Sequence, residues 1–257
     1  MVAKTFKLDE VELPRIGLGT NRLRDTISNR SFLRSAVAAG LGLIDTARLY
    51  AGGDSEAAIG AALAPYPGSV AVATKGGYRS NEPDGIRAEI EQSLVRLRTD
   101  TIDLWYLHRF HDDAPLESTM RLIGEYVDAG RIRRVGLSEV TVAQIRAARA
   151  IVPIAAVQNE YGLGERKHED VIDFCAAEGI AFVPFYPLAG GEGPALLEAA
   201  ERRGASPDQI KLAWLLHRSE CIVPIPGTLS IEHFRANLAA LEIELRADEL
   251  RSLAGAA

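Results

Sequence analysis

Abundant cysteine, long apolar runs and an excess of positive charge are all missing from this 257-residue sequence. Its two cysteines, Cys175 and Cys221, lie in apolar stretches and have neither zinc-site spacing nor the density of a disulfide framework. The N-terminus has no basic segment followed by an apolar core, so we expect no signal peptide. The longest apolar stretch, residues 180–190, is interrupted by prolines and is far shorter than the roughly 20 residues of a membrane-spanning helix. These absences predict a cytoplasmic protein without a membrane partner.

The net charge of −6 argues against a nucleic-acid partner, because nucleic-acid-binding domains carry basic surfaces. No G-x-G-x-x-G follows a strand-like run and no G-x-x-x-x-G-K-[ST] occurs, which excludes two common nucleotide-binding loops. What is present is an ordinary globular composition, with 47% apolar and 25% charged residues. Since no linker or low-complexity segment interrupts the chain, we expect a single domain over residues 1–257.

Eight strand-like runs are spaced along the chain and alternate with segments of helical periodicity. They cover residues 15–20, 42–47, 70–75, 102–108, 133–138, 155–161, 180–185 and 221–227. A short hairpin is expected within residues 6–15. Eight strands, each followed by a helix, in about 250 residues predict an α/β fold of the (β/α)8 TIM barrel type with a short N-terminal hairpin. A doubly wound sheet is the alternative, but its usual glycine fingerprint is missing.

The helical segments carry their own signals. In residues 84–97 the apolar side chains recur at intervals that place them on one face of a helix. Thr141 with Gln144 and Ser206 with Gln209 are each spaced as a capping box, so helices are predicted to begin at these two points. Only one helix, within residues 246–255, is expected after the last strand-and-helix unit, so no long C-terminal loop is available to close a pocket.

Four titratable side chains stand at or just beyond the C-terminal ends of consecutive predicted strands. Asp45 and Tyr50 follow the second strand, Lys75 ends the third and His108 ends the fourth. Each alone has a structural explanation, but in a TIM barrel these strand ends share the active-site face. An ammonium beside a tyrosine stabilises the phenolate and lowers its pKa, and a carboxylate holds the ammonium in place. Together the four residues are typical of a proton-transfer site.

The same residues lie in motifs that resemble the aldo-keto reductase superfamily. The motifs are IDTARLYAGGDSE, VATKGG, DLWYLHR, GLSEV, VQNEY, VPFYPLAGG and IPGTLSIEHFRANLAA, which occur in the family's order over nearly the whole chain. The resemblance implies a barrel that binds a nicotinamide cofactor without a Rossmann fingerprint. It also implies a catalytic tetrad that reduces a small-molecule carbonyl substrate. In that tetrad Tyr50 donates the proton, Lys75 and Asp45 tune it, and His108 binds the carbonyl oxygen.

The resemblance further implies a set of cofactor-binding positions: Gly19, Thr20, Asp45, Ser138, Glu139, Gln158, Phe185, Pro187, Leu188, Gly190, Pro226, Gly227, Thr228, His233 and Asn237. Among them, Ser138 and Gln158 are expected at the nicotinamide carboxamide, and Phe185 is expected to stack on the nicotinamide ring. Gly190 belongs to a glycine-rich loop expected beside the pyrophosphate.

Several of these positions depart from the family's pattern. Glu139 stands where Asn is frequent, and a carboxylate can accept but not donate a hydrogen bond. Gly227 and His233 stand where NADP-binding members often carry Lys and Arg, and Arg235 is close enough to replace one lost charge. NADPH is therefore the expected cofactor and NADH is possible.

Two other function classes compete with this interpretation. A sensor or regulatory subunit could bind the cofactor on the same fold with little turnover, although all four tetrad residues are present. A metal-dependent hydrolase would need paired histidines; His111, Asp112 and Asp113 cluster near His108, but we expect no metal site. The substrate is not defined by the sequence, and the last two motifs resemble bacterial reductases that include pyridoxal reductase-like members.

Overall fold

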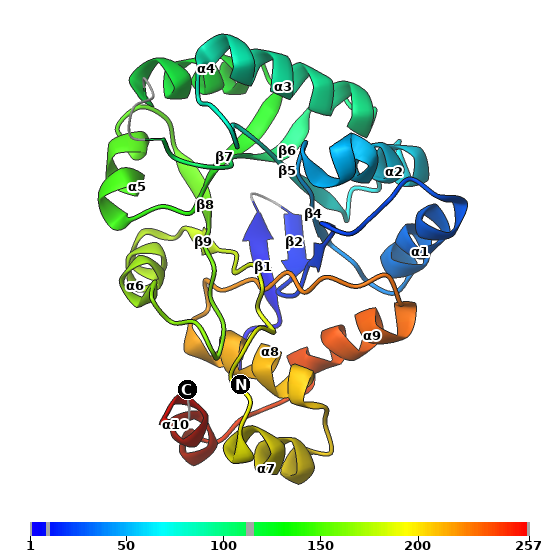
Figure 1. The fold of residues 1–257 in the computed structure, drawn as a ribbon, viewed down its shortest axis with the longest axis vertical. Helices are drawn as coiled ribbons and strands as arrows, with labels where there is room; N and C mark the ends of the chain where they lie inside the picture. The colour runs from blue at the N-terminus through cyan, green and yellow to red at the C-terminus, as the bar shows by residue number, and fades with distance from the viewer. Residues whose placement is uncertain (1, 9–10, 112–115, 256–257) are drawn as a thin grey trace.

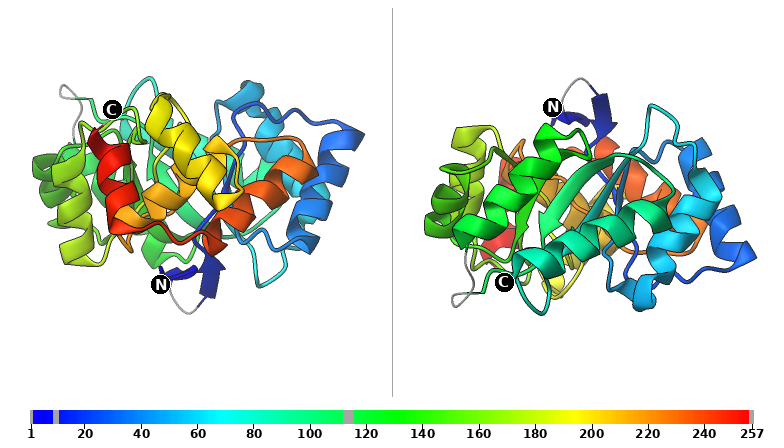
Figure 2. Two further views of the ribbon diagram at one scale, coloured as in Figure 1. Left: turned by 90° about the horizontal axis from the view of Figure 1, so that it is seen from below. Right: turned by 90° about the horizontal axis from the view of Figure 1, so that it is seen from above.

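The computed structural model describes residues 2–8, 11–111 and 116–255. Its centre is a parallel sheet of seven strands in sequential order, curled so that helices form an outer ring (Figures 1 and 2). The strands are β3 (Leu18–Gly19), β4 (Leu43–Asp45), β5 (Ala71–Gly76), β6 (Ile102–Leu107), β7 (Ile132–Ser138), β8 (Ile154–Gln158) and β9 (Ala181–Phe182). The predicted barrel fold is confirmed.

The helices follow the strands in the order that a (β/α)8 barrel requires. They are α1 (Ile27–Ala38), η1 (Tyr50–Gly53), α2 (Asp54–Leu63), α3 (Pro83–Leu97), α4 (Leu116–Asp128), α5 (Val142–Arg149), α6 (Glu169–Glu178), α7 (Pro194–Arg203), α8 (Pro207–Arg218), α9 (Ile231–Ala239), η2 (Ala240–Glu242) and α10 (Ala247–Gly255). Both predicted capping boxes are present, at Thr141 with Gln144 and at Ser206 with Gln209. Among the described residues, none of the helices combines the length and apolar character of a membrane span.

The eighth predicted strand, residues 221–227, occupies the gap between β9 and β3 without forming a regular strand. Val223 donates its backbone N–H to Phe182 on one side (2.8 Å), and Gly17 donates to Pro224 on the other (3.0 Å). Isolated parallel bridges join Phe182 to Ile222 and Gly19 to Gly227. Because Pro224 and Pro226 have no N–H to donate, a continuous ladder is impossible here. The segment nevertheless closes the barrel at the predicted position.

The predicted hairpin consists of β1 (Thr5–Leu8) and β2 (Val11–Pro14), which pair antiparallel with Phe6 opposite Leu13. It lies across one end of the barrel (Figures 1 and 2). There Leu8 and Leu13 pack with Leu43 and Ala71, which begin β4 and β5. The N-terminal ends of the strands are therefore covered by apolar side chains, and the C-terminal ends remain available for a polar site.

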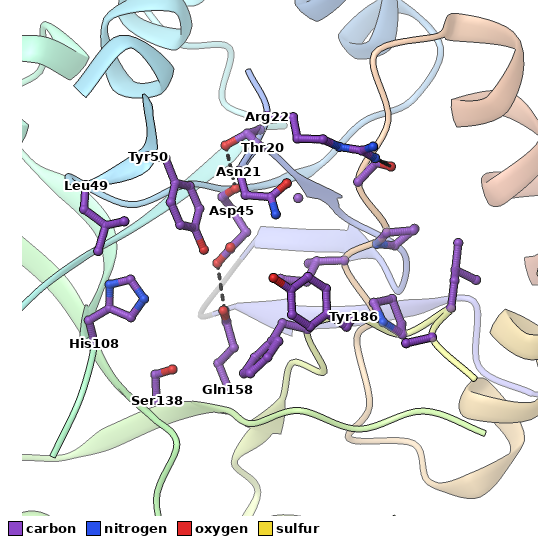
Figure 3. A pocket seen from close by; sticks show the side chains of 18 of the residues that line it. Thr20, Asn21, Arg22, Asp45, Leu49, Tyr50, His108, Ser138, Gln158 and Tyr186 are labelled. Atoms are coloured by element: carbon purple, nitrogen blue, oxygen red, sulfur yellow. Dashed lines mark hydrogen bonds between the residues drawn. The ribbon is translucent and has the colours of Figure 1, made fainter. Parts of the chain in front are cut away.

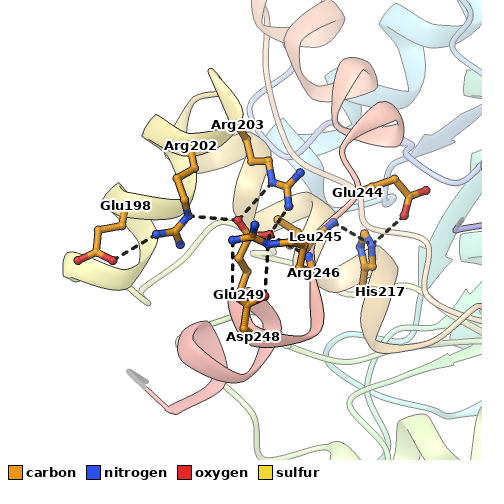
Figure 4. Close-up of polar contacts among 9 residues, drawn as sticks. All are labelled: Glu198, Arg202, Arg203, His217, Glu244, Leu245, Arg246, Asp248 and Glu249. Carbon is orange, nitrogen blue, oxygen red and sulfur yellow. Dashed lines mark hydrogen bonds and ion pairs between the residues drawn. The ribbon is translucent and has the colours of Figure 1, made fainter.

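The C-terminal helix α10 docks beside α7 through a buried carboxylate (Figures 1 and 4). The Glu249 side chain accepts hydrogen bonds from the guanidinium groups of Arg202 and Arg203 and from the backbone N–H of Arg246. His217 on α8 accepts from the Leu245 N–H (3.2 Å), which ties the segment before α10 to the barrel. The predicted last helix is thus present and is fixed to the outer ring.

Candidate active site

A cavity of about 620 Å³ opens at the C-terminal ends of the strands (Figure 3). Parallel pairing in register brings these ends to one edge of the barrel. The cavity is lined by Gly19, Thr20, Asn21, Arg22, Asp45, Leu49, Tyr50, Tyr78, His108, Arg109, Ser138, Gln158, Phe185, Tyr186, Pro187, Leu188, Ala189, Ile225, Pro226 and Gly227. None of them comes after Gly227, so the described part of the C-terminal segment leaves this mouth open.

An ion pair between Asp45 and Lys75 lies at the base of the cavity, with both side chains buried. The Lys75 Nζ lies 2.5 Å from Asp45 Oδ1 and also donates to the Thr46 carbonyl oxygen at 2.7 Å. Gln158 Nε2 donates to the second carboxylate oxygen at 2.8 Å. Burial alone would lower the pKa of Lys75, but the charge of Asp45 and the nearby Tyr50 raise it on balance. Lys75 is therefore held as an ammonium.

Tyr50 begins the short helix η1, and its ring faces this ion pair. The Lys75 Nζ lies 5.1 Å from the ring centroid, and Figure 3 shows the Tyr50 hydroxyl directed toward the same space as Asp45 and His108. Burial raises the pKa of Tyr50, and the Lys75 ammonium opposes this shift without overcoming it. The expected net lowering of the Tyr50 pKa is therefore wrong, because desolvation of the half-buried side chain outweighs the charge of Lys75. The phenol is protonated at neutral pH.

His108 follows β6, and its ring lies between two tyrosines. The ring centroids lie 6.2 Å from Tyr50 and 5.0 Å from Tyr78, both in edge-to-face contact. Burial, with the positive charges of Lys75 and Arg109, lowers the pKa of His108 to about 2. The imidazole is thus neutral over the physiological range, and it keeps one N–H donor and one acceptor. Among the described residues, its buried Nδ1 has no hydrogen-bond partner.

The structure brings most of the predicted cofactor positions to the cavity wall and leaves others away from it. Those that line the cavity are Gly19, Thr20, Asp45, Ser138, Gln158, Phe185, Pro187, Leu188, Pro226 and Gly227. Those that do not are Glu139, Gly190, Thr228, His233 and Asn237. His233 and Asn237 lie in α9, and Thr228 lies just before its N-cap, Ser230.

Glu139 has a structural role that its sequence position did not reveal. Its backbone has a φ of +55°, a conformation in which Asn is favoured over other non-glycine residues. Its carboxylate accepts the backbone N–H of Glu160 at 2.9 Å, which joins the ends of β7 and β8. The side chain is therefore engaged with the protein beside the cavity.

The glycine-rich loop after β9 is explained in large part by packing. Gly190 and Gly191 have positive φ angles, and a Cβ on the neighbouring Gly164 would meet the Gly191 nitrogen at 2.6 Å. Lys211 on α8 is buried and holds the loop by donating to the Leu188 carbonyl oxygen (3.0 Å) and to Glu192 (2.9 Å). These contacts fix the part of the loop that lines the cavity.

Several lining residues were missed by the sequence interpretation, among them Asn21, Arg22, Leu49, Tyr78 and Arg109. Arg22 donates to the Gly227 carbonyl oxygen at 3.2 Å, across the closure of the barrel. Each missed residue lies within a few positions of one that was predicted. Closeness in sequence to a predicted site residue could therefore have indicated these positions. It does not predict which side chains of a loop point into the cavity.

The described residues contain no group of three or more His, Cys, Asp or Glu side chains arranged to hold a metal ion. His111 donates its backbone N–H to Asn81 Oδ1, and its Nε2 lies 3.2 Å from the Tyr78 carbonyl oxygen. Asp112 and Asp113, which were considered with it, lie outside the described residues.

Comparison with known proteins yields one family. The sequence profile of the Aldo/keto reductase family matches residues 15–193 and 192–257. The chain is 34% identical over 282 residues to pyridoxine 4-dehydrogenase of Escherichia coli, with 99% of each protein covered. It is 35% identical over 273 residues to an uncharacterized oxidoreductase of Schizosaccharomyces pombe, with 98% of this chain and 89% of the relative covered.

Solved structures agree with the sequence matches. A thermostable aldo-keto reductase in complex with the inhibitor epalrestat superposes with a TM-score of 0.91 at 30% identity, covering 98% of this chain and 99% of the other. An aldo-keto reductase from Klebsiella pneumoniae in complex with NADPH superposes with a TM-score of 0.87 at 30% identity, covering 98% and 94%.

Proposed function

Because this chain belongs to the aldo/keto reductase family of oxidoreductases, we propose that it reduces an aldehyde or ketone to an alcohol with NADPH and with Tyr50 as the proton donor. The observation that carries the proposal is the placement of Tyr50 against the buried Asp45–Lys75 pair and beside a neutral His108, all at one cavity.

The electrostatics of the tetrad fit an acid in the reducing direction. The Tyr50 phenol is protonated at neutral pH, so a proton is available for the oxygen of the carbonyl group as negative charge develops there. Loss of that proton leaves a phenolate, and the Lys75 ammonium, whose Nζ lies 5.1 Å from the Tyr50 ring centroid, stabilises that negative charge. Asp45 keeps the ammonium in this position through its 2.5 Å contact. General acid catalysis of this kind contributes about 10²- to 10⁴-fold in rate.

His108 serves a different purpose in this proposal. A neutral imidazole adds no charge to the cavity and can donate one hydrogen bond to the carbonyl oxygen. The edge-to-face contact with Tyr50 keeps the two side chains next to each other, so both address the same oxygen atom. Orientation of the reacting carbonyl is the expected contribution of His108.

The cavity also fits a nicotinamide dinucleotide, which supplies the hydride when bound. Ser138 and Gln158 present polar atoms at neighbouring strand ends, as a carboxamide requires, and Phe185 lines the wall beside them. Gly227 and the α9 N-terminus, which Ser230 caps, suit the phosphate end. The Klebsiella pneumoniae relatives crystallised with NADP and with NADPH support the phosphorylated cofactor.

The test is a turnover assay with purified protein, NADPH and a generic aromatic aldehyde, followed by the loss of NADPH absorbance. We expect aldehyde-dependent oxidation of NADPH and formation of the alcohol. Tight NADPH binding without any turnover across a panel of aldehydes and ketones would instead identify the sensor or regulatory alternative.

A further inference from the structure

Arg109 places a guanidinium group on the cavity wall directly after His108. Its Nη1 donates to the His108 carbonyl oxygen at 3.0 Å and lies 3.5 Å from Ser138 Oγ. The guanidinium carbon lies 5.3 Å from the centroid of the Tyr78 ring, a cation–π distance. The charge is therefore held in one position by its own backbone and by an aromatic face.

The backbone that carries Arg109 is itself fixed. The buried Asn81 donates from one Nδ2 to both the Arg109 carbonyl oxygen (3.0 Å) and the Gly77 carbonyl oxygen (3.1 Å). Thr119 at the start of α4 donates to the Asn81 carbonyl oxygen in turn. Asn81 thus clamps the loop after β5 to the loop after β6. Because its backbone and guanidinium are already fixed, Arg109 loses little additional conformational entropy when it binds a ligand.

The charge of Arg109 is not balanced by any carboxylate within ion-pair distance among the described residues. Of the described residues that line the cavity, only Asp45 is acidic, and it is engaged with Lys75, while His108 is neutral. Arg22, the other lining cation, reaches toward Gly227 at the expected phosphate end. Within the described part of the chain, the Nε and Nη2 atoms of Arg109 have no hydrogen-bond partner. This edge of the guanidinium matches the planar geometry of a carboxylate.

Three exposed apolar side chains line the cavity, and Tyr78 is the one in contact with Arg109. Leu49, Tyr78 and Tyr186 are 38%, 46% and 58% exposed. Large apolar side chains that are exposed to solvent around a cavity indicate a surface that binds an apolar ligand. The wall therefore combines an aromatic and aliphatic surface with the fixed cation of Arg109.

We propose that Arg109 is a specificity-determining residue that binds a carboxylate on the substrate. The preferred substrate class is then an aldehyde with an apolar, for example aromatic, body that carries a carboxylate remote from the carbonyl group. This inference rests on the proposed carbonyl reduction and adds the class of substrate to it.

The experiment compares 4-carboxybenzaldehyde with its neutral methyl ester, methyl 4-formylbenzoate, at saturating NADPH. We expect kcat/KM to favour the acid in the unaltered protein. In Arg109→Gln the value for the acid should fall about 10- to 100-fold, while the value for the ester changes by less than about 3-fold, because only the charge-assisted hydrogen bonds are lost. The matched control is Arg79→Gln, since Arg79 is exposed next to Tyr78 and does not line the cavity. This control should leave both values unchanged.

Equal kcat/KM values for acid and ester in the unaltered protein would overturn the inference. So would an equal loss for both substrates in Arg109→Gln, which would assign Arg109 to His108, Ser138 or the cofactor. A binding measurement separates this inference from the proposed function. Calorimetric titration of NADP⁺-loaded protein with 4-(hydroxymethyl)benzoate should give weaker binding in Arg109→Gln even if no aldehyde is turned over, and equal binding in both proteins would contradict the role of Arg109.

Discussion

Two of the buried carboxylates in this molecule, Asp45 and Glu249, are paired with cations in opposite ways. Asp45 meets one ammonium, Lys75, which is itself buried, and burial raises the pKa of Asp45 despite that charge. Glu249 meets Arg203 and Arg202, whose side chains are partly exposed, and the hydrogen bonds from Arg203 first of all lower its pKa to about 2 (Figure 4). Burial thus dominates the pKa of the carboxylate at the cavity, whereas hydrogen bonds dominate the pKa of the carboxylate on the outer ring.

The two ion pairs are expected to serve different purposes: Asp45–Lys75 serves catalysis, and the contacts of Glu249 serve the stability of the fold. Removing both partners from water costs free energy that a single ion pair does not always recover, so the inner pair is poor evidence of stabilisation. The Asp45–Lys75 pair instead holds the Lys75 ammonium next to the Tyr50 ring. The outer cluster joins α7 to α10 at the surface, where its cations keep part of their hydration. Variants at the two sites should therefore affect different measurements.

The largest effect is expected for Lys75→Met, which should lower kcat for aldehyde reduction by about 10²- to 10⁴-fold because Tyr50 loses the charge that stabilises its phenolate. Removal of the ammonium should also raise the pKa of Tyr50 further, so the alkaline fall in the reduction rate should move to higher pH.

Two controls make this prediction specific. Lys7→Met changes an exposed lysine on β1 and should leave the rate unchanged. The double variant Asp45→Asn with Lys75→Met removes both buried charges, so a slow but folded, NADPH-binding protein would rule out misfolding as the cause. An unshifted pH profile in Lys75→Met would show that another group controls the proton.

A smaller effect, on stability alone, is expected for Glu249→Gln. Loss of the charge-assisted hydrogen bonds should lower the free energy of unfolding by about 1–3 kcal/mol, measured by denaturant titration at pH 7. The value of kcat should not change, because α10 does not contribute to the cavity wall. Asp248→Asn, at an exposed side chain on the same helix, should have no measurable effect on unfolding.

The Glu249 effect has a defined pH dependence. The folded-state pKa is about 2 and the ordinary value is 4.5, so the stabilisation is fully present above 4.5 and is lost as the pH falls toward 2. The difference in unfolding free energy between the unaltered protein and Glu249→Gln should shrink over this window. A difference that stays constant down to pH 2 would refute the ionic origin of the contact.

The smallest effect is expected at the phosphate end of the cofactor site. Arg235 is an exposed cation on α9, which follows the segment that contains Gly227. We expect a preference for NADPH over NADH that falls only about 2- to 5-fold in Arg235→Ala, since exposed charges contribute little. The measurement is the ratio of kcat/KM for the two cofactors, with Arg34→Ala on α1 as control. An unchanged ratio would leave Arg235 without a role.

The sequence predicts the barrel and the positions of the tetrad because apolar runs and strand-end polar residues are local patterns. Asp45, Tyr50 and His108 line the cavity, and Lys75 is paired with Asp45 from the neighbouring strand. The eighth strand is predicted at the right place, but Pro224 and Pro226 prevent regular pairing.

What the sequence does not predict depends on side-chain direction and burial. The net direction of the Tyr50 pKa shift follows from how deeply the ring is buried, which no motif contains. The inward turn of Arg109 follows from the Asn81 clamp and the Tyr78 ring, contacts between two loops far apart in the sequence. Glu139 was expected at the cofactor, and its bond to the Glu160 N–H could not be foreseen without the geometry of two strand ends.

We propose that Tyr50 donates the proton from the position set by Lys75 and Asp45. The most direct test of this proposal is the single-turnover rate of aldehyde reduction in Tyr50→Phe, with NADPH affinity measured in parallel as the check on folding. We predict unchanged NADPH binding and a rate at least about 10²-fold lower, because the ring remains and only the acid is gone. Reduction at the unaltered rate by a Tyr50→Phe variant that binds NADPH normally would contradict it.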